Sequence, residues 1–228
     1  MIKTFLTSGF IAASTLTLTN SAFAEISGQL AVGYEIGSYE VVTNIDIEAD
    51  ISMLTLSGSL FFDNGVYTKL SHGTSEEDEW SINGLTVPFG FDVDETTLTV
   101  GTTVDEIGIM AGYQSKTTEF VGVGEIDVSG VFLGLSKSYD AGDGALYFSG
   151  ALAFMGADFL VVGEETIEAD MAIGFSLGAG YNQAISENLV LSATVKYQSY
   201  TLDWNVNTDG DEEREVFLRY GISLGYNF

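Results

Sequence analysis

Side chains along much of this sequence alternate with a period of two. In Ala169–Tyr181 the odd positions are apolar or aromatic, and the even positions other than Asp170 are Ala, Gly or Ser. The segment Val216–Phe228 repeats the pattern, with aliphatic and aromatic residues at every even position. Successive side chains of a β-strand point to opposite faces, whereas a helix repeats every 3.6 residues. The alternation therefore predicts strands.

The less apolar face of these strands is built mainly of Gly, Ala and Ser. In a soluble β-sandwich that face meets water and is rich in Lys, Glu and Thr. Small residues suit the crowded inside of a narrow barrel. Aromatic residues near the expected strand ends resemble an interfacial girdle: Tyr34, Phe62, Tyr113, Tyr139, Tyr181, Tyr226 and Phe228. We therefore expect an all-β fold, an antiparallel up-and-down transmembrane β-barrel, with a secreted β-sandwich as the alternative.

Ten strands are expected, which would place both chain ends on the same, periplasmic side. Their ranges are 27–37, 51–62, 66–73, 95–103, 107–120, 126–139, 145–160, 168–181, 189–204 and 215–228. The fourth strand has the weakest pattern. The preceding segment Thr74–Asp94 contains Trp80 and several other apolar residues, which could form a loop folded over the barrel mouth. Eight strands with longer loops is the alternative.

Short turns alternate with long acidic segments, an asymmetry typical of outer-membrane barrels. The expected short turns are Asp63–Gly65, Val104–Glu106, Asp140–Gly144 and Asn182–Asn188. The expected extracellular loops are Ser38–Asp50, Thr74–Asp94, Val121–Glu125, Gly163–Glu168 and Asn205–Glu215. The Asp-Asn-Gly sequence at 63–65 is a strong tight-turn signal.

The N-terminus has the three parts of a secretory signal peptide. A basic start with Lys3 precedes a short apolar stretch and an Ala-Phe-Ala sequence at 22–24. We expect residues 1–24 to be removed and residues 25–228 to form one barrel domain with no soluble domain attached. The mature chain offers no run of 18 apolar residues, so a transmembrane helix is not expected. A closed barrel is the other structure that can span lipid.

Charged residues are few, and most of them are acidic. The chain has 7 Lys and Arg against 33 Asp and Glu. Without Lys3 the mature chain carries 6 basic residues and a formal charge of 6 − 33 = −27. Such a surface repels nucleic acid, whose phosphates require basic partners, and favours divalent cations or basic partners. A saline habitat is an alternative reason for the acidity. There is no cysteine, hence no disulfide and no thiolate metal site.

The C-terminus, Tyr220-Gly221-Ile222-Ser223-Leu224-Gly225-Tyr226-Asn227-Phe228, resembles the closing strand of outer-membrane barrels. The resemblance implies that Tyr226 and Phe228 signal to the barrel-assembly machinery, although Ser223 stands near the usual glycine. In pattern and length the mature chain resembles the small OmpA-like and opacity-like barrels of the porin family. That resemblance implies a monomer in the outer membrane of a Gram-negative bacterium, surrounded by lipid and lipopolysaccharide.

Catalytic patterns are weak. His72, the sole histidine, shares the outward face with Leu70, and no third group orients it. A lipid-modifying esterase would need such a group. An omptin-like protease would need Asp and His residues around a water. The chain has one histidine and many acids, so an acid near that histidine is weak evidence for a protease. We therefore do not expect an enzyme.

Acidic runs are weak candidates for calcium ligands, because carboxylate oxygens suit that ion. Solvated loop charge is the alternative for both runs. The candidates are Glu76, Glu77, Asp78, Glu79, Asp209, Asp211 and Glu212. We expect no cofactor beyond loosely bound divalent cations, which could bridge the loops to lipopolysaccharide.

Basic residues are few, and their positions are informative. Lys69, Lys116, Lys196 and Arg219 all fall on the lumen face of their strands. A charge facing lipid at the bilayer midplane would cost about 2–4 kcal/mol. Inside the lumen these residues can pair with Glu35 or Asp170. The first and last strands of a barrel are neighbours, so Glu35 is the expected partner of Arg219, with Asp170 or a loop acid as the alternative.

The pattern therefore predicts an outer-membrane barrel with a structural or narrow-pore permeability role. The alternative is a surface protein whose loops bind cations, lipid, or a host or phage partner. A lipid-modifying enzyme is the third hypothesis.

Overall fold

The computed structural model describes residues 26–42, 47–75, 78–163, 166–204 and 213–228, nearly all of which lie in strands. None of these residues forms a helix long and apolar enough to cross a membrane. The signal peptide predicted at 1–24 lies outside the described residues. The strands are β1 (Ser27–Val42), β2 (Ile47–Phe61), β3 (Val66–Ser75), β4 (Asp78–Ile82), β5 (Leu85–Val104), β6 (Ile107–Phe120), β7 (Gly124–Ala141), β8 (Gly144–Val161), β9 (Ile167–Ala184), β10 (Leu189–Trp204) and β11 (Glu213–Asn227).

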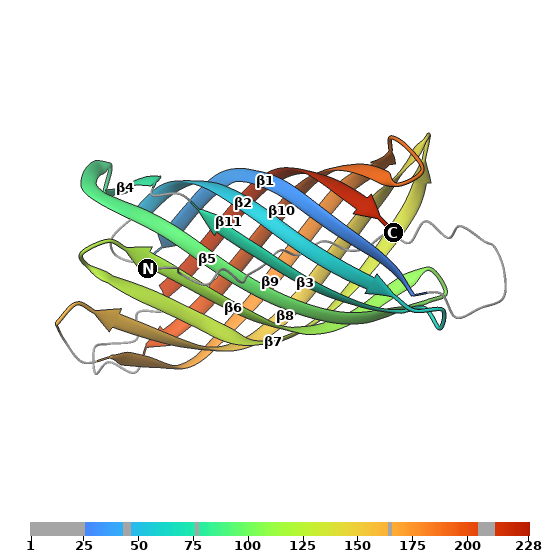
Figure 1. The fold of residues 1–228 in the computed structure, drawn as a ribbon. Coiled ribbons are helices and arrows are strands. Elements are labelled where there is room, and N and C mark those ends of the chain that lie inside the picture. Colours follow the sequence, from blue (N-terminus) through green and yellow to red (C-terminus); the bar gives the residue numbers. More distant parts are fainter. Residues whose placement is uncertain (1–25, 43–46, 76–77, 164–165, 205–212) are drawn as a thin grey trace.

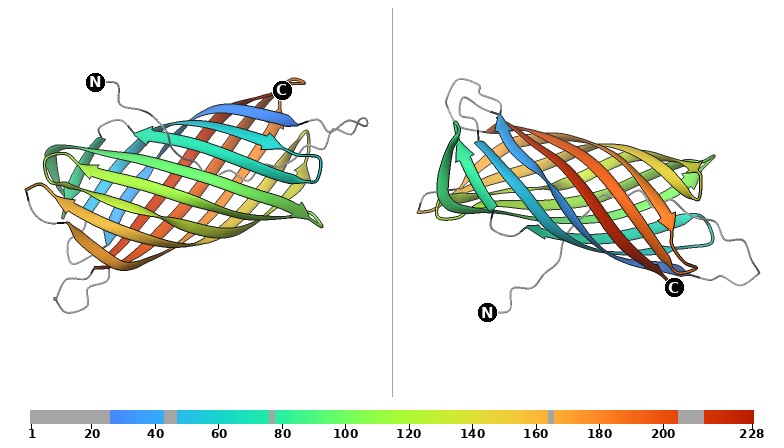
Figure 2. Two further views of the ribbon diagram at one scale, coloured as in Figure 1. Left: turned by 60° about the horizontal axis from the view of Figure 1, so that its bottom comes forward. Right: turned by 90° about the horizontal axis from the view of Figure 1, so that it is seen from above.

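The strands form one closed antiparallel barrel with ten wall positions, as the sequence predicted (Figures 1 and 2). Apart from β3 and β4, which do not pair with each other, each strand pairs with its sequence neighbours, and β1 pairs with β11 to close the wall. The short β4 follows β3 in the same position, between β2 and β5. At the seam, Gly28 and Phe228 exchange two backbone hydrogen bonds of 2.9 Å. The C-terminus therefore closes the barrel at the end opposite the β4–β5 hairpin (Figure 1).

We call the end of the barrel where Phe228 lies the turn side, because short hairpin turns join the strands there. The opposite end is the loop side. The predicted turns at Gly65 and Gly142 are present, and both glycines have positive φ angles, of 78° and 63°. Asp105 and Glu106 also have positive φ angles, 48° and 68°, between β5 and β6. Two consecutive positive φ angles match the right-handed twist of the flanking strands, which is why such turns favour hairpins.

The outer surface of the turn-side half is apolar. In β7 the outward side chains Val131, Leu133 and Leu135 are all more than half exposed. The same holds for residues of other strands, including Leu30, Leu54, Leu152, Leu177 and Ile222. We call this surface the apolar belt. In β7 it runs from Val131 to Tyr139, about nine residues, which at 3.4 Å per residue and a 45° tilt spans about 22 Å. That height suits the hydrocarbon layer of an outer membrane.

Above the belt the polarity of the two faces is reversed. Outward residues of β7 become Ser129, Asp127 and Glu125, while the inward residues Val128 and Ile126 are apolar and buried. The other strands carry carboxylates on the same outward face; these residues form the acidic rim: Glu40, Glu48, Asp50, Glu79, Asp94, Glu119, Glu125, Asp127, Asp158, Glu168 and Asp203. The loop-side half is thus built like a water-soluble β-barrel with a dry inside.

The prediction of extracellular loops was wrong in part, because parts of these acidic segments lie in strands. Most of the segments Ser38–Asp50 and Thr74–Asp94 are strand, and Val121–Glu125 contains a tight turn in which Gly122 has a φ of 81°. Gly163–Glu168 and Asn205–Glu215 also end in strand, while 164–165 and 205–212 lie outside the described residues. Acidic residues signalled loops in the sequence, but here they face water from strands whose inner face is apolar.

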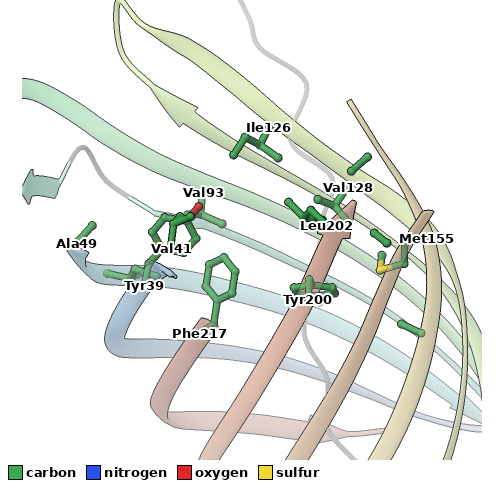
Figure 3. Packing of buried hydrophobic residues seen from close by; sticks show 14 of the residues in the cluster. Tyr39, Val41, Ala49, Val93, Ile126, Val128, Met155, Tyr200, Leu202 and Phe217 are labelled. Carbon is green, nitrogen blue, oxygen red and sulfur yellow. The ribbon is translucent and has the colours of Figure 1, made fainter. Parts of the chain in front are cut away.

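Apolar side chains fill the loop-side half of the lumen, and Figure 3 shows part of this cluster pointing inward from the wall. We call five aromatic residues of this cluster the plug: Tyr39, Trp80, Phe91, Phe120 and Phe217. The ring of Tyr39 lies 4.9 Å from that of Phe91 and 4.7 Å from that of Phe217, and Trp80 lies 5.1 Å from Phe120. Trp80 was predicted in a loop over the mouth; it instead points inward from β4.

Candidate functional site: the charged layer of the lumen

Seven buried charged side chains point into the barrel, beside the plug and on its turn side. Each is at most 5% exposed: Glu35, Lys69, Glu95, Lys116, Lys196, Glu215 and Arg219. They come from β1, β3, β5, β6, β10 and β11, at inward positions of the period-two pattern. Burying an isolated charge is costly, so the stability of the folded barrel depends on how these charges pair.

Arg219 is the centre of this layer. Its Nη2 atom lies 2.6 Å from Glu95 Oε2, and its Nη1 atom lies 3.6 Å from Glu35 Oε2. It also donates a hydrogen bond to Gln198 Oε1, and its Nη1 contacts the sulfur of Met53 at 3.3 Å. One guanidinium thus joins the first strand to the opposite β5 wall, as its fork of five N–H donors allows.

Two lysines complete the ion pairs. Lys196 Nζ donates to Glu35 Oε1 at 2.5 Å, and Lys116 Nζ donates to Glu215 Oε2 at 2.5 Å. Tyr39 donates from its hydroxyl to the other oxygen of Glu215 at 2.7 Å. Lys116 Nζ also lies 3.9 Å from the ring centre of Phe217, close enough for a cation–π contact. The Lys116–Glu215 pair therefore contacts the plug at both Tyr39 and Phe217.

Neutral side chains extend the Arg219 group to Tyr200, whose ring centre lies 4.5 Å from Lys116 Nζ. Gln114 donates to Glu95 at 3.0 Å and accepts from the hydroxyl of Tyr200 at 3.2 Å. Tyr200 in turn accepts from Gln198 at 3.1 Å. The hydrogen bonds run continuously from Arg219 to Tyr200. A cavity beside Gln114 and Tyr200 has a volume of about 10 Å³, about the size of one water molecule.

The structure brings most of the predicted lumen residues together. Glu35, Lys196 and Arg219 form one group, and Lys116 lies in the same layer. Asp170 lies in β9, where the pairing registers with β8 and β10 both shift, and its side chain is not among those described. Sequence reasoning missed Glu95 and Glu215. Their inward parity was readable, but both sit at the first residue of an expected strand, beside a supposed acidic loop.

Lys69 differs from the other three cations. It is 5% exposed, and it lies between Ser59 of β2 and Thr99 of β5 in the register. Among the residues that the structure describes, no carboxylate lies within salt-bridge distance of its ammonium group. The charges of this layer therefore sum to 4 − 3 = +1 over the described side chains.

The remaining predicted site residues lie elsewhere. Tyr226 and Phe228 stand on the outer surface at the turn side, where the Phe228 ring covers Gly28. Glu79 is exposed on β4, and Asp78 precedes it. Glu76, Glu77, Asp209, Asp211 and Glu212 lie outside the described residues. Within the described ranges, no group of three acidic or histidine side chains is placed to hold a metal ion. Cation binding stays a prediction.

His72 occupies the outward face of β3, beside Leu70 in the apolar belt, as its parity predicted. Its neighbours in the register are Leu56 of β2 and Thr96 of β5. This places the imidazole on the outer wall and not in the charged layer of the lumen.

Solved structures with the same fold are outer-membrane proteins. The outer membrane protease OmpT from Escherichia coli superimposes with a TM-score of 0.58 over 94% of this chain and 100% of that one, at 12% identity. The chain has the fold of an outer-membrane β-barrel. With the apolar belt, this fold places the protein in that membrane. Neisserial surface protein A matches with a TM-score of 0.46 at 10% identity, covering 89% of this chain and 98% of that one.

No protein-family model matches the sequence, and no curated protein matches it. The predicted membership of the OmpA-like or opacity-like barrels therefore has no support beyond the shared barrel fold, and whether the chain is an enzyme stays a prediction.

Proposed function

We propose that the protein is a structural outer-membrane barrel that does not conduct solutes. The observation that carries this proposal is the plug. Tyr39, Phe91 and Phe217 are each at most 2% exposed, and they pack across the loop-side half of the lumen. An apolar, water-free stretch of lumen is a barrier to ions, because moving an ion out of water is costly.

The charged layer supports the same role. Arg219 and Lys196 link β10 and β11 to β1 and β5 across the lumen, so the wall is cross-braced from inside. Paired charges of this kind fix one arrangement of the strands, and breaking a pair leaves a buried charge without a partner. Of the two roles that the sequence left open, a narrow pore and a closed barrel, these contacts favour the closed barrel.

Planar-bilayer recording tests the proposal. The purified barrel is expected to insert without adding conductance steps. A variant in which Phe91, Phe120 and Phe217 are replaced by Ala should conduct, because it removes three rings of the plug. A matched control with three belt residues replaced by Ala should stay silent. Steady conductance steps in the parent protein would overturn the closed-barrel function.

A second candidate function is binding of a basic partner at the acidic rim. The specific observation is a cavity of about 460 Å³ on β1, β2, β4 and β5, whose lining includes Glu40, Glu48, Asp50 and Glu79. Glu40 and Glu48 stand directly opposite each other in the register. Like charges so placed repel, and a cationic group between them would relieve the repulsion.

An oligolysine peptide is a suitable probe for the rim. The parent should bind it with an affinity that falls as salt rises, and Glu40→Lys with Glu48→Lys should weaken binding at least tenfold. Glu187→Lys, on the turn side, is the control, because it makes the same change from Glu to Lys away from the rim. Equal binding by the rim and turn-side variants would rule out this surface.

A further inference from the structure

The turn-side half of the lumen differs from the plugged half in chemistry and in access. Its inward side chains are mostly hydroxyls, which include Thr55, Ser57, Ser59, Thr99, Ser149 and Thr194. Thr55 and Ser57 are partly exposed, whereas the plug is buried. We call this space the vestibule. It lies between the turns and the charged layer.

Inward carboxylates are absent from the described residues of the vestibule. The three buried acids, Glu35, Glu95 and Glu215, all belong to the charged layer, and each has a cation within 4 Å. The acids near the turns, such as Asp105 and Glu187, are exposed. The chain has 33 acidic residues, and none of the described ones points into the vestibule. The vestibule therefore offers hydrogen-bond donors without negative charge.

Lys69 stands at the closed end of the vestibule with its charge unmatched. It is 5% exposed, and Ser59 and Thr99 flank it on the neighbouring strands. Glu35, which attracts Lys69 electrostatically, is already held by Lys196 and Arg219. Lys196 is also close enough to repel it. A buried ammonium group without a counter-charge is costly, so the site gains stability from an anion.

We propose that the vestibule binds a small oxyanion of the phosphate class. The ammonium group of Lys69 supplies the charge, and the hydroxyls of Ser59 and Thr99 donate hydrogen bonds to the anion's oxygens. Charge-assisted hydrogen bonds from lysine to phosphate oxygens are strong, and hydroxyl donors add direction. The anion enters from the turn side and stops at the charged layer. This inference does not rest on the closed-barrel function, because Lys69, Ser59 and Thr99 are not part of the plug.

Thermal unfolding in detergent tests the site. Sodium phosphate is titrated against sodium chloride at equal ionic strength and pH 7. The midpoint of the parent should rise saturably, by roughly 3–6 °C at ten times Kd. Glycerol 3-phosphate is a second probe: a matching rise indicates that phosphomonoesters bind as well as free phosphate, and no rise indicates free phosphate alone. Both results support the site.

Lys69→Met removes the charge and keeps much of the side-chain volume, so it should fold and lose the phosphate effect. Lys69→Gln is the second variant should the first not fold. Lys137→Met, on the outer wall near the turns, should respond like the parent. Line broadening of the free phosphate signal in phosphorus NMR gives an independent readout. An unresponsive parent, or an equal phosphate rise in the parent and in Lys69→Met or Lys69→Gln, overturns the proposal.

Discussion

Replacing Arg219 by Leu is the most direct test of how the charged layer stabilises the barrel. Arg219 is 2% exposed and holds two carboxylates, Glu95 at 2.6 Å and Glu35 at 3.6 Å. Glu35 keeps Lys196, but Glu95 keeps only its hydrogen bond from Gln114. The variant therefore leaves one buried carboxylate without a cation. Removing one partner of a buried pair costs about 3–5 kcal/mol.

The expected shift is large enough to measure. For a chain of this size 1 kcal/mol moves the midpoint by about 2–4 °C, so Arg219→Leu should lower it by about 6–20 °C. Heat-modifiability on gels and circular dichroism in detergent both report this midpoint. Adding Glu95→Gln to the variant should restore a large part of the loss, because the uncompensated charge is then gone.

Arg214→Leu is the matched control. Arg214 was predicted in an acidic loop, but it lies in β11 on the outer surface, where it donates to Ser199 and Tyr197 at 2.8 Å. Contacts of an exposed charge of this kind are worth about 0–1 kcal/mol. Equal midpoints for the parent and Arg219→Leu would refute the reasoning, as would a loss that Glu95→Gln does not reduce.

Three further predictions concern the wall and the plug. Leu133→Arg should cost about 2–4 kcal/mol of folding stability in lipid, because it faces the bilayer, whereas Ser129→Arg on the same face of β7 lies above the belt and should cost less than 1 kcal/mol; equal losses in vesicle refolding would contradict the belt. Deleting Phe228 should reduce the yield of folded barrel, since it removes both backbone hydrogen bonds to Gly28, and an unchanged yield on heat-modifiability gels would count against the seam. Phe217→Ala should destabilise the barrel by about 3–5 kcal/mol, because it empties the centre of the plug, and a loss below 1 kcal/mol in urea unfolding would show that the plug is loosely packed.

The period-two pattern was sufficient to predict the closed barrel and its ten strands. It works because lipid and lumen impose opposite demands on neighbouring side chains, as at Arg219 and Tyr220. The pattern is less informative above the bilayer. There the outward residue is Asp127 and the inward one is Val128, so the alternation persists with its meaning reversed. The acidic residues there suggested loops. The loop-side ends of several strands were therefore predicted too close to the bilayer.

The pairing inside the lumen was predictable only in part. Adjacent first and last strands made Glu35 and Arg219 candidates for contact, because closure of the barrel requires that neighbourhood. Glu95 lies on the far wall, and its approach to Arg219 depends on the tilt and stagger of the strands, which local sequence does not encode. Lys116 and Glu215 meet for the same reason, at a separation of 99 residues.

The reversal of polarity along the strands also fixes how deeply the protein sits. Sliding the barrel inward by two residues would carry carboxylates of several strands into hydrocarbon at once, among them Asp94 and Asp127. Sliding it outward would expose the leucines of the belt to water. Both movements raise the free energy. The barrel is therefore most stable in a bilayer whose hydrocarbon thickness matches the height of the apolar belt. In a thicker bilayer the lipid around this barrel must thin to meet it, since a rigid, cross-braced wall cannot stretch.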